Sequence, residues 1–516
     1  MKYIIPVALL FSVTACSKLN EKLNNAQTPA QAEASSTATG LLKSAYYSLN
    51  PALIDQAGWW ALAEHTSDEI AGPTRSNNWD DNGVWRVLHQ HKWDAQHTYI
   101  TATFENLLIL QYNATNVLNF KPTAQQAAEA RFLRAFSIYL VASGWGQVPY
   151  RANDESLTTS PKILKDSAAI NFVISELNAI MNDLPANAVG SSTTANKDAA
   201  KALLMKCYLN RGVYTNAAHR MAPTFDPADM AQVISLANSL TGYSLTPNYY
   251  DNFSPTSSTA SKEMIWGFVS SPAADAAGGN NVRSRWYQTL NYNQNPGGWN
   301  GFCTLSDFYS KFETADKRRY DTYTGVTDVS GLNAGFLIGQ QYDQNHNPIA
   351  HSSSSNGGPA LVYLADVNPN LQETDPNTLD ITGIRVLKFV PDYGTGSHVN
   401  DPSNELPFFR YGDVLLMKAE AALRTGDNAT ALTIINQIRQ PRGASVKASV
   451  TLVDILDERG RELYEEMWRR EDQIRFGTFL KPNVAKNYTS AAKYLVFPIP
   501  ENDLVANPNL IQNDGY

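Results

Sequence analysis

The sequence predicts a mainly α-helical protein in which paired helices flank a long, loop-rich insertion that carries short strands. Apolar residues recur at helical spacing in residues 94–240 and again in residues 408–480. Between residues 242 and 407 this periodicity fades, and Gly, Asn, Ser, Pro and aromatic residues dominate. Irregular stretches of this length inside a folded protein are usually functional. We therefore expect the working surface to lie in the insertion.

The N-terminus has the pattern of an export signal. The apolar run from Ile4 to Val13 is too short to span the roughly 30 Å core of a bilayer as a helix, so residues 1–15 are predicted to be a signal peptide. The run ends in Val13-Thr14-Ala15-Cys16, and small residues before a cysteine resemble the bacterial lipoprotein processing motif. That resemblance implies that Cys16 is lipidated and becomes the mature N-terminus, where two or more acyl chains would hold the protein on a membrane.

A tether and a folded part follow the leader. Residues 16–39 are poor in large apolar residues, which predicts a flexible tether, and residues 40–516 are the folded part. The whole chain has 43% hydrophobic and 17% charged residues, enough apolar surface to form a core. Its net charge is −8 and it has no long run of Lys or Arg, which argues against nucleic acid as a partner.

Three helices are predicted before the insertion. Residues 127–143 place apolar side chains on one face, residues 163–184 carry a further helical pattern that stops at Pro185, and a third helix runs from residue 199 to a Gly at position 212. Cys207 lies in the apolar stripe of this third helix, where a buried free thiol is expected. A bridge from Cys207 to Cys303 is possible in an oxidising compartment, but no local pattern supports it.

The same pattern returns near the C-terminus. Residues 410–423 form a predicted helix, Gly426 offers a stop, and residues 429–439 resume helical spacing. Two helices joined by so short a turn must lie antiparallel. This style of small-residue helix pair, also present at residues 201–217, is typical of tetratricopeptide-like repeats.

A last long helix is predicted to begin at Thr451, with Asp454 completing a capping box. Glu465 and Glu466 then stand four residues before Arg469 and Arg470, a favourable spacing for ion pairs along one face. We interpret this charge set as an ion-paired helix face instead of a catalytic group.

Two turn-rich segments, residues 68–93 and 286–300, indicate a carbohydrate site. Sugar rings present flat C–H faces that lie on Trp or Tyr rings, while their hydroxyls need fixed Asp, Asn or Arg groups. Both segments mix these residue types with Pro and Gly turns. Trp79 and Trp286 are expected to be exposed, and Trp85 and Trp93 to pack. The candidate binding residues are Asp68, Arg75, Asn77, Trp79, Asp80, Trp286, Tyr287, Tyr292, Trp299 and Asn300.

Metal, cofactor and catalytic interpretations find less support. An EF-hand loop fitted to residues 78–89 fails at its twelfth position, where His89 stands in place of Glu. His89, His91 and His97 lie around Trp93 and are expected to pack or hydrogen-bond. The chain has no nucleophile elbow, phosphate loop, zinc-helix motif or dinucleotide fingerprint, so neither catalysis nor a cofactor is expected.

An ordered set of motifs along nearly the whole chain resembles the SusD/RagB family of nutrient-binding lipoproteins of Bacteroidetes. No single motif is specific, but their order is. They are the Asp-Glu, Pro-Thr-Arg and Trp-Asp elements of residues 68–80, Glu129-Ala-Arg-Phe-Leu-Arg-Ala135, Gly144-Trp-Gly-Gln-Val-Pro149, Arg410-Tyr-Gly-Asp-Val-Leu-Leu-Met-Lys-Ala-Glu420, Asn436-Gln-Ile-Arg439, Glu458-Arg-Gly-Arg-Glu462 and Tyr494-Leu-Val-Phe-Pro-Ile-Pro500.

The resemblance implies a single helical domain built on tetratricopeptide-like repeats, with a loop-rich face that binds glycans. It implies a lipid anchor in the outer membrane that faces the cell exterior, and a SusC-like, TonB-dependent transporter as partner, with the lipoprotein as a hinged lid. Acidic residues that often follow the lipidated cysteine in such exported proteins are sparse here. The candidate loop residues correspond by region and residue type only.

Three other functions remain open at this point. A surface glycosidase would need two facing carboxylates, which the order of residues does not reveal. A pure scaffold would use the repeats to hold partners and leave the exposed aromatic residues without a ligand. A peptide-binding lipoprotein of the same transport class would use the same Trp and Tyr residues.

Overall fold

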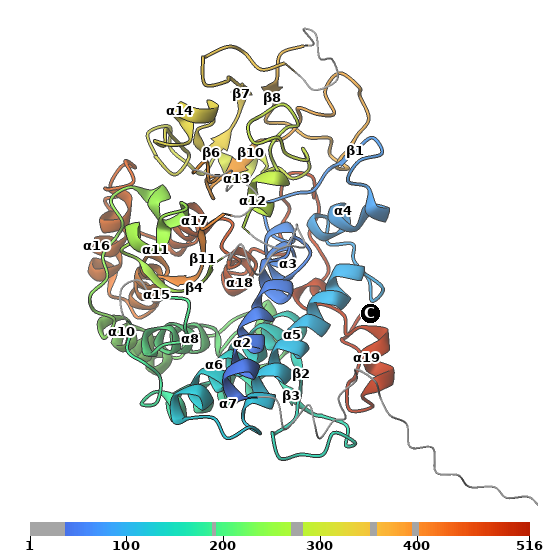
Figure 1. The fold of residues 1–516 in the computed structure, drawn as a ribbon, viewed down its shortest axis with the longest axis vertical. Helices are drawn as coiled ribbons and strands as arrows, with labels where there is room; N and C mark the ends of the chain where they lie inside the picture. Colours follow the sequence, from blue (N-terminus) through green and yellow to red (C-terminus); the bar gives the residue numbers. More distant parts are fainter. Residues whose placement is uncertain (1–36, 188–191, 270–281, 351–358, 395–401) are drawn as a thin grey trace, which may run out of the picture. The chain divides into compact units, whose positions relative to one another are not determined.

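The computed structural model describes residues 37–187, 192–269, 282–350, 359–394 and 402–516, and Ala38–Tyr516 form one unit. The predicted signal peptide, Cys16 and nearly all of the tether lie outside the described residues. The prediction of a mainly helical protein is confirmed: helices form most of the regular structure, and the strands are short (Figure 1). No helix in the described ranges is both long and apolar enough to cross a membrane.

The N-terminal helices pack around one long helix, α5. Both α2 and α6 pack along α5. The predicted helix at residues 127–143 is α6, which is longer than expected: a Thr123–Gln126 capping box begins it, and Gly146, at φ 72°, ends it. The elements are α2 (Ala38–Tyr47), η1 (Asn50–Ile54), α3 (Trp59–His65), η2 (Asp81–Gly83), α4 (Val84–His89), α5 (Thr98–Val117) and α6 (Ala124–Trp145).

The second group of helices precedes the insertion. The helix predicted from residue 163 begins later, because residues 162–165 pair as a strand with residues 147–150. α8 packs against α10, and both also contact α15 from the far end of the sequence. The elements are β2 (Gln147–Tyr150), β3 (Lys162–Lys165), α7 (Ser167–Ile180), α8 (Lys197–Asn210), α9 (Ala217–Met221) and α10 (Pro227–Asn238).

The C-terminal helices confirm the predicted antiparallel pair. α15 (Tyr411–Arg424) and α16 (Asn428–Arg439) meet across Gly426, which has φ 87°. The predicted capping box begins α17 (Leu452–Leu463). α18 (Arg469–Arg475), η6 (Ala492–Leu495) and α19 (Glu501–Ala506) follow.

The expected ion-paired helix face at residues 465–470 is wrong, because α17 ends at Leu463. Glu465 and Met467 adopt left-handed φ values of 61° and 73°, so the chain turns into the interior. Glu466 binds Arg410 there at 2.8 Å. These charges are internal connections between distant segments.

The insertion consists of small sheets. The short strands expected in the insertion are present: β11 pairs antiparallel with β4, and β10 pairs antiparallel with β6. β1, from the first candidate loop, pairs in parallel with β9 and so joins that loop to the insertion. The strands are β1 (Thr74–Arg75), β4 (Met264–Val269), β5 (Tyr320–Asp321), β6 (Ala334–Leu337), β7 (Gly339–Gln340), β8 (Val362–Tyr363), β9 (Gln372–Glu373), β10 (Arg385–Leu387) and β11 (Glu405–Arg410). The short helices are η3 (Tyr249–Phe253), α11 (Ser257–Ala260), α12 (Ser284–Tyr287), α13 (Ser306–Tyr309) and α14 (Thr327–Ser330).

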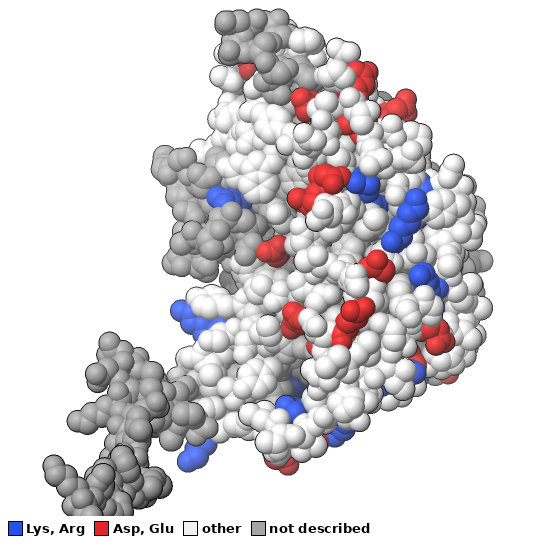
Figure 2. Space-filling view, turned by 90° about the vertical axis from the view of Figure 1, so that its right-hand side faces the viewer, with Lys and Arg blue, Asp and Glu red and all other residues white. Residues whose placement is uncertain are grey.

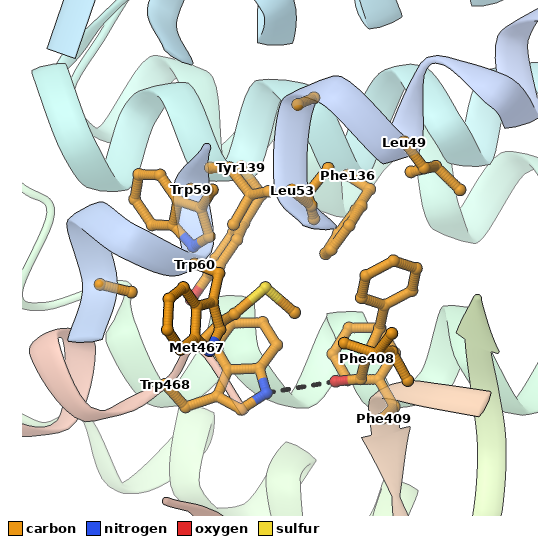
Figure 3. Packing of buried hydrophobic residues seen from close by; sticks show 14 of the residues in the cluster. Leu49, Leu53, Trp59, Trp60, Phe136, Tyr139, Phe408, Phe409, Met467 and Trp468 are labelled. Carbon is orange, nitrogen blue, oxygen red and sulfur yellow. Dashed lines mark hydrogen bonds between the residues drawn. The ribbon is translucent and has the colours of Figure 1, made fainter. Parts of the chain in front are cut away.

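Large aromatic side chains fill the core where α3, α6, β11 and the start of α18 meet (Figure 3). Trp468 stacks on Phe409 with ring centroids 5.7 Å apart, and its indole N–H donates to the carbonyl of Phe408 at 3.2 Å. Burying aromatic groups of this size supplies much of the hydrophobic stabilisation of a core. The thiols of Cys207 and Cys303 are both free and buried.

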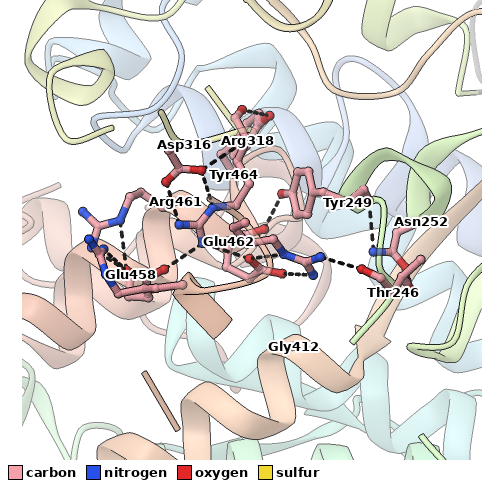
Figure 4. A network of polar contacts seen from close by, with 12 residues as sticks. Thr246, Tyr249, Asn252, Asp316, Arg318, Gly412, Glu458, Arg461, Glu462 and Tyr464 are labelled. Carbon is pink, nitrogen blue, oxygen red and sulfur yellow. Dashed lines mark hydrogen bonds and ion pairs between the residues drawn. The ribbon is translucent and has the colours of Figure 1, made fainter. Parts of the chain in front are cut away.

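A buried network of ion pairs connects the insertion to the C-terminal helices (Figure 4). The carboxylate of Glu462 on α17 forms ion pairs with Arg318 from the insertion at 2.9 Å, with Arg410 at 2.8 Å and with Arg442 at 3.1 Å. Arg442 also forms an ion pair with Glu263 at 2.9 Å. Burial would raise the pKa of Glu462, but these guanidinium groups outweigh it and hold that pKa well below its usual range. The network therefore fixes the position of the insertion, because removing any one partner would leave a buried charge unpaired.

Candidate functional site

The tryptophans divide sharply by exposure. All ten lie in the described ranges, and eight are buried: Trp59, Trp60, Trp85, Trp93, Trp145, Trp266, Trp286 and Trp468. Trp85 and Trp93 are thus packed, as expected, but the expected exposure of Trp286 is wrong. Trp299 is 40% exposed and Trp79 is half-buried, so these two indoles reach the surface.

Trp79, Tyr287 and Trp299 form one group of rings, which we call the aromatic patch. The rings of Tyr287 and Trp299 stack at 5.7 Å with an interplanar angle of 23°. The ring centroids of Trp79 and Trp299 lie 6.5 Å apart, and the indole N–H of Trp79 donates to the carbonyl of Trp299 at 2.9 Å. Tyr292, on the same loop as Trp299, is 42% exposed. The two segments selected from the sequence therefore meet in space.

The backbone is shaped to present Trp79. Arg75 and Asn78 exchange hydrogen bonds that close a tight turn, and Trp79 then adopts a left-handed φ of 59°. Its ring lies directly on Gly301, where an added Cβ would stand 2.2 Å from the indole. Left-handed backbone in a bulky residue is costly and concentrates at functional sites. Gly301 is therefore required for the position of Trp79.

Polar groups surround the patch. Asn77 is exposed at the tip of the turn, and Asp80 beside it pairs with Arg86 at 2.6 Å. The hydrogen bond from Arg86 lowers the pKa of Asp80, which keeps its carboxylate ionised. Arg283 stands over the ring of Tyr287, 5.4 Å from its centroid. These groups are suitable partners for the hydroxyls of a bound sugar.

Four of the other candidate residues are structural and buried. Asp68 forms a two-bond ion pair with Arg469 at 2.7 and 2.9 Å, and Trp286 is enclosed in the core. Asn300 is buried, donates to the backbone of Asp380 at 2.9 Å and accepts from Arg385. None of these side chains offers free polar surface to a ligand.

Arg75 is the fourth buried candidate. Its guanidinium donates to the hydroxyl of Thr382 at 2.9 Å, to the Thr382 carbonyl at 3.0 Å and to the carbonyl of Gly301 at 3.3 Å. Burial and the neighbouring Arg385 lower its pKa to about 10. The side chain is an internal connection between the first loop and the insertion, so its role is to hold the patch together.

A surface hollow of about 460 Å³ lies between the end of the first loop and the start of α5, and no residue of the aromatic patch lines it. Asp81, Asn82, Lys92, Gln96 and Tyr99 are among the residues that line it. Figure 2 shows the side of the molecule that carries β1 and α4, where Asp, Glu, Lys and Arg are scattered and uncharged surface prevails. Such a surface suits a ligand recognised by stacking and hydrogen bonds.

The histidines near the first loop are held by hydrogen bonds. His89 Nε2 lies 2.9 Å from the carbonyl of Val484, and His97 Nε2 lies 3.0 Å from that of Val84. The His91 ring lies 2.8 Å from both the Thr66 carbonyl and the Ser490 hydroxyl. Within the described residues, no group of three or more His, Cys, Asp or Glu side chains is arranged to hold a metal.

The sequence missed two residues that support the patch. Gly301 follows the Pro-Gly-Gly loop and carried no signal beyond its residue type, since its role depends on a ring more than 200 positions earlier. Arg283 precedes the second segment by three residues, and only the turn of α12 brings it over Tyr287.

Comparisons with known proteins agree with this architecture. Residues 262–516 match the sequence model of the SusD family. The starch-binding protein SusD of Bacteroides thetaiotaomicron is 27% identical over 453 residues, which cover 79% of this chain and 76% of that protein. The chain is therefore similar to SusD-family proteins over most of its length.

Solved structures show the same fold. Surface glycan-binding protein A from Bacteroides thetaiotaomicron, in complex with laminarihexaose, superimposes with a TM-score of 0.66 at 18% identity over 92% of this chain and 98% of that one. A laminarin-binding SusD-like protein gives a TM-score of 0.68 at 18% identity over 93% and 99% of the two chains. At this level of identity the likeness defines the fold.

Proposed function

We propose that this chain is a cell-surface lipoprotein that captures oligosaccharides on the aromatic patch and delivers them to a SusC-like, TonB-dependent transporter in the outer membrane. The observation that carries the proposal is the position of Trp299, Tyr287 and Trp79. In a chain that buries eight of its ten tryptophans, the remaining two meet at the surface across 220 residues of sequence. Exposed aromatic surface of this kind marks a binding site.

The ligand class follows from the chemistry of the patch. A sugar ring covers an indole face with its C–H groups, which stabilises the complex through burial and contact with the π system. Asn77, Asp80 and Arg283 stand at the margin to bind hydroxyls. Similarity to the SusD family supports the same class, since the relative from Bacteroides thetaiotaomicron is a starch-binding protein and a structural neighbour holds laminarihexaose.

Binding without cleavage is the direct test. The folded part is titrated with laminarihexaose, maltohexaose and a panel of other oligosaccharides by isothermal titration calorimetry, and the recovered sugars are analysed by chromatography. We expect at least one glycan to bind and to be recovered intact. Shorter products would identify a glycoside hydrolase instead, and binding of peptides but of no glycan would assign a peptide carrier.

The anchor and the transporter are tested in cells. Mass spectrometry of the N-terminal peptide should show lipid on Cys16, and a Cys16→Ser chain should leave the membrane fraction. Affinity purification of the wild-type protein from outer membranes should recover a TonB-dependent barrel. A freely secreted, unmodified wild-type protein would contradict this part of the proposal.

A further inference from the structure

A second hollow, of about 290 Å³, lies within the insertion. It is formed by α13, by β5 and β6, and by the chain around β7, with Phe336 and Leu337 among its walls. The volume is close to that of small-molecule sites in proteins, about 300 Å³ at the lower end. No residue of the aromatic patch lines it. The lining residues are Tyr309, Thr314, Arg319, Tyr320, Gly331, Asn333, Phe336, Leu337, Ile338, Gln340, Gln341 and Tyr342.

Three tyrosines line the hollow. Tyr320 is 54% exposed and Tyr342 is 44% exposed, and Tyr309 packs edge-on against Phe336 at 5.6 Å. Gly331, at φ 79°, allows the chain at Tyr342 to come close, because an added Cβ would stand 2.3 Å from the Tyr342 carbonyl. Large rings left exposed around a concave surface are suited to cover the flat face of a ligand.

The polar groups of this hollow carry one uncompensated charge. The guanidinium of Arg319 lies over the ring of Tyr309 at 4.4 Å and donates to the Tyr309 hydroxyl at 2.8 Å and to Thr314 at 3.2 Å. Both acceptors are neutral, and Arg319 forms no ion pair with any carboxylate of the described chain. Asn333 donates to the Tyr320 hydroxyl at 2.9 Å and so holds that ring in place.

The positive charge of Arg319 determines which class of ligand the hollow can bind. Asp and Glu are absent from the twelve lining residues, so the hollow offers amides, hydroxyls and a single cation. A guanidinium held by neutral partners binds carboxylate or sulfate oxygens through charge-assisted hydrogen bonds. Stacking rings combined with one fixed cation match a sugar ring that carries an acidic substituent.

We propose that this hollow is a second carbohydrate subsite that accepts an acidic sugar unit, with Arg319 binding its carboxylate and Tyr320 and Tyr342 covering the ring. The inference rests on the proposed function only for the general class of ligand. Because the two sites share no residue, each can fail while the other stands.

The test uses hexagalacturonate as the acidic probe and laminarihexaose as the neutral probe, titrated into the folded part by calorimetry. We expect hexagalacturonate to bind, Arg319→Gln to weaken that binding at least tenfold, and Tyr320→Ala with Tyr342→Ala to weaken it similarly. Trp299→Ala, in the aromatic patch, should leave this binding unchanged. Raising the salt concentration should weaken binding of the wild type and have much less effect on Arg319→Gln.

Three results would overturn the subsite: no binding of hexagalacturonate, binding that Arg319→Gln leaves unchanged, or a preference of this site for the neutral probe. Circular dichroism of each variant must match the wild type, and Arg319→Lys gives a second measurement because it keeps the charge while losing the planar fork. Loss of laminarihexaose binding in Trp299→Ala, with hexagalacturonate binding intact, would show that the two sites are independent.

Discussion

Replacing Trp299 by Ala measures directly how much the aromatic patch contributes to glycan affinity. Trp299 is 40% exposed, which corresponds to roughly 100 Å² if a whole Trp presents about 250 Å². At about 25 cal/mol per Å², covering all of that area contributes about 2.5 kcal/mol, and covering half of it about 1.2 kcal/mol. Because about 1.4 kcal/mol is a factor of ten, we expect Kd to rise about 8- to 60-fold.

Calorimetry with whichever glycan binds the wild type most tightly measures this change. Tyr112→Ala is the matched control, because Tyr112 is 52% exposed on α5 and lies outside the patch. It should leave Kd unchanged, and the urea midpoints of both variants should stay close to that of the wild type, since surface substitutions change stability by roughly 0.5 kcal/mol. Equal affinity of Trp299→Ala and the wild type would show that the glycan does not bind on Trp299.

Three further substitutions test the interior beneath the patch. Trp286→Ala should lower the free energy of unfolding by about 3–5 kcal/mol in urea titrations, because it leaves a cavity in the core. Gly301→Ala should weaken glycan binding as much as Trp79→Ala while the fold persists, because its Cβ displaces that indole; unchanged affinity would count against the contact. Burial outweighs the neighbouring cations and raises the pKa of Glu465 to about 8, so stability present at low pH is lost as the pH rises toward 8. Glu465→Gln should remove that loss, so its advantage over the wild type in unfolding free energy should grow between pH 5 and pH 8; a constant difference would contradict the shift.

The helices could be predicted from the sequence wherever local signals determine them. α6, α15 and α16 follow apolar periodicity, and α17 begins at the predicted capping box. The end of α17 could not be predicted in this way. The charged residues after α17 bind partners far away in sequence, as Glu466 binds Arg410. The i,i+4 spacing of charges along a chain does not predict such contacts.

The two candidate loops could be selected from composition, but the direction of each side chain within them could not be predicted. Trp286 and Tyr287 are neighbours on the four-residue helix α12, and one enters the core while the other joins the patch. Arg75 and Asn300 have the residue types of sugar ligands, yet both serve as internal hydrogen-bonding groups. Turn residues indicate that a segment is a surface loop, whereas tertiary packing decides which of its side chains face water.

A crystal structure of the folded part with its bound oligosaccharide would show where the glycan lies. We expect a sugar ring stacked on Trp299, with carbon atoms within ~4 Å of the indole and with Tyr287 or Trp79 beside it. An ordered glycan bound elsewhere, with these three rings left uncovered, would contradict this expectation.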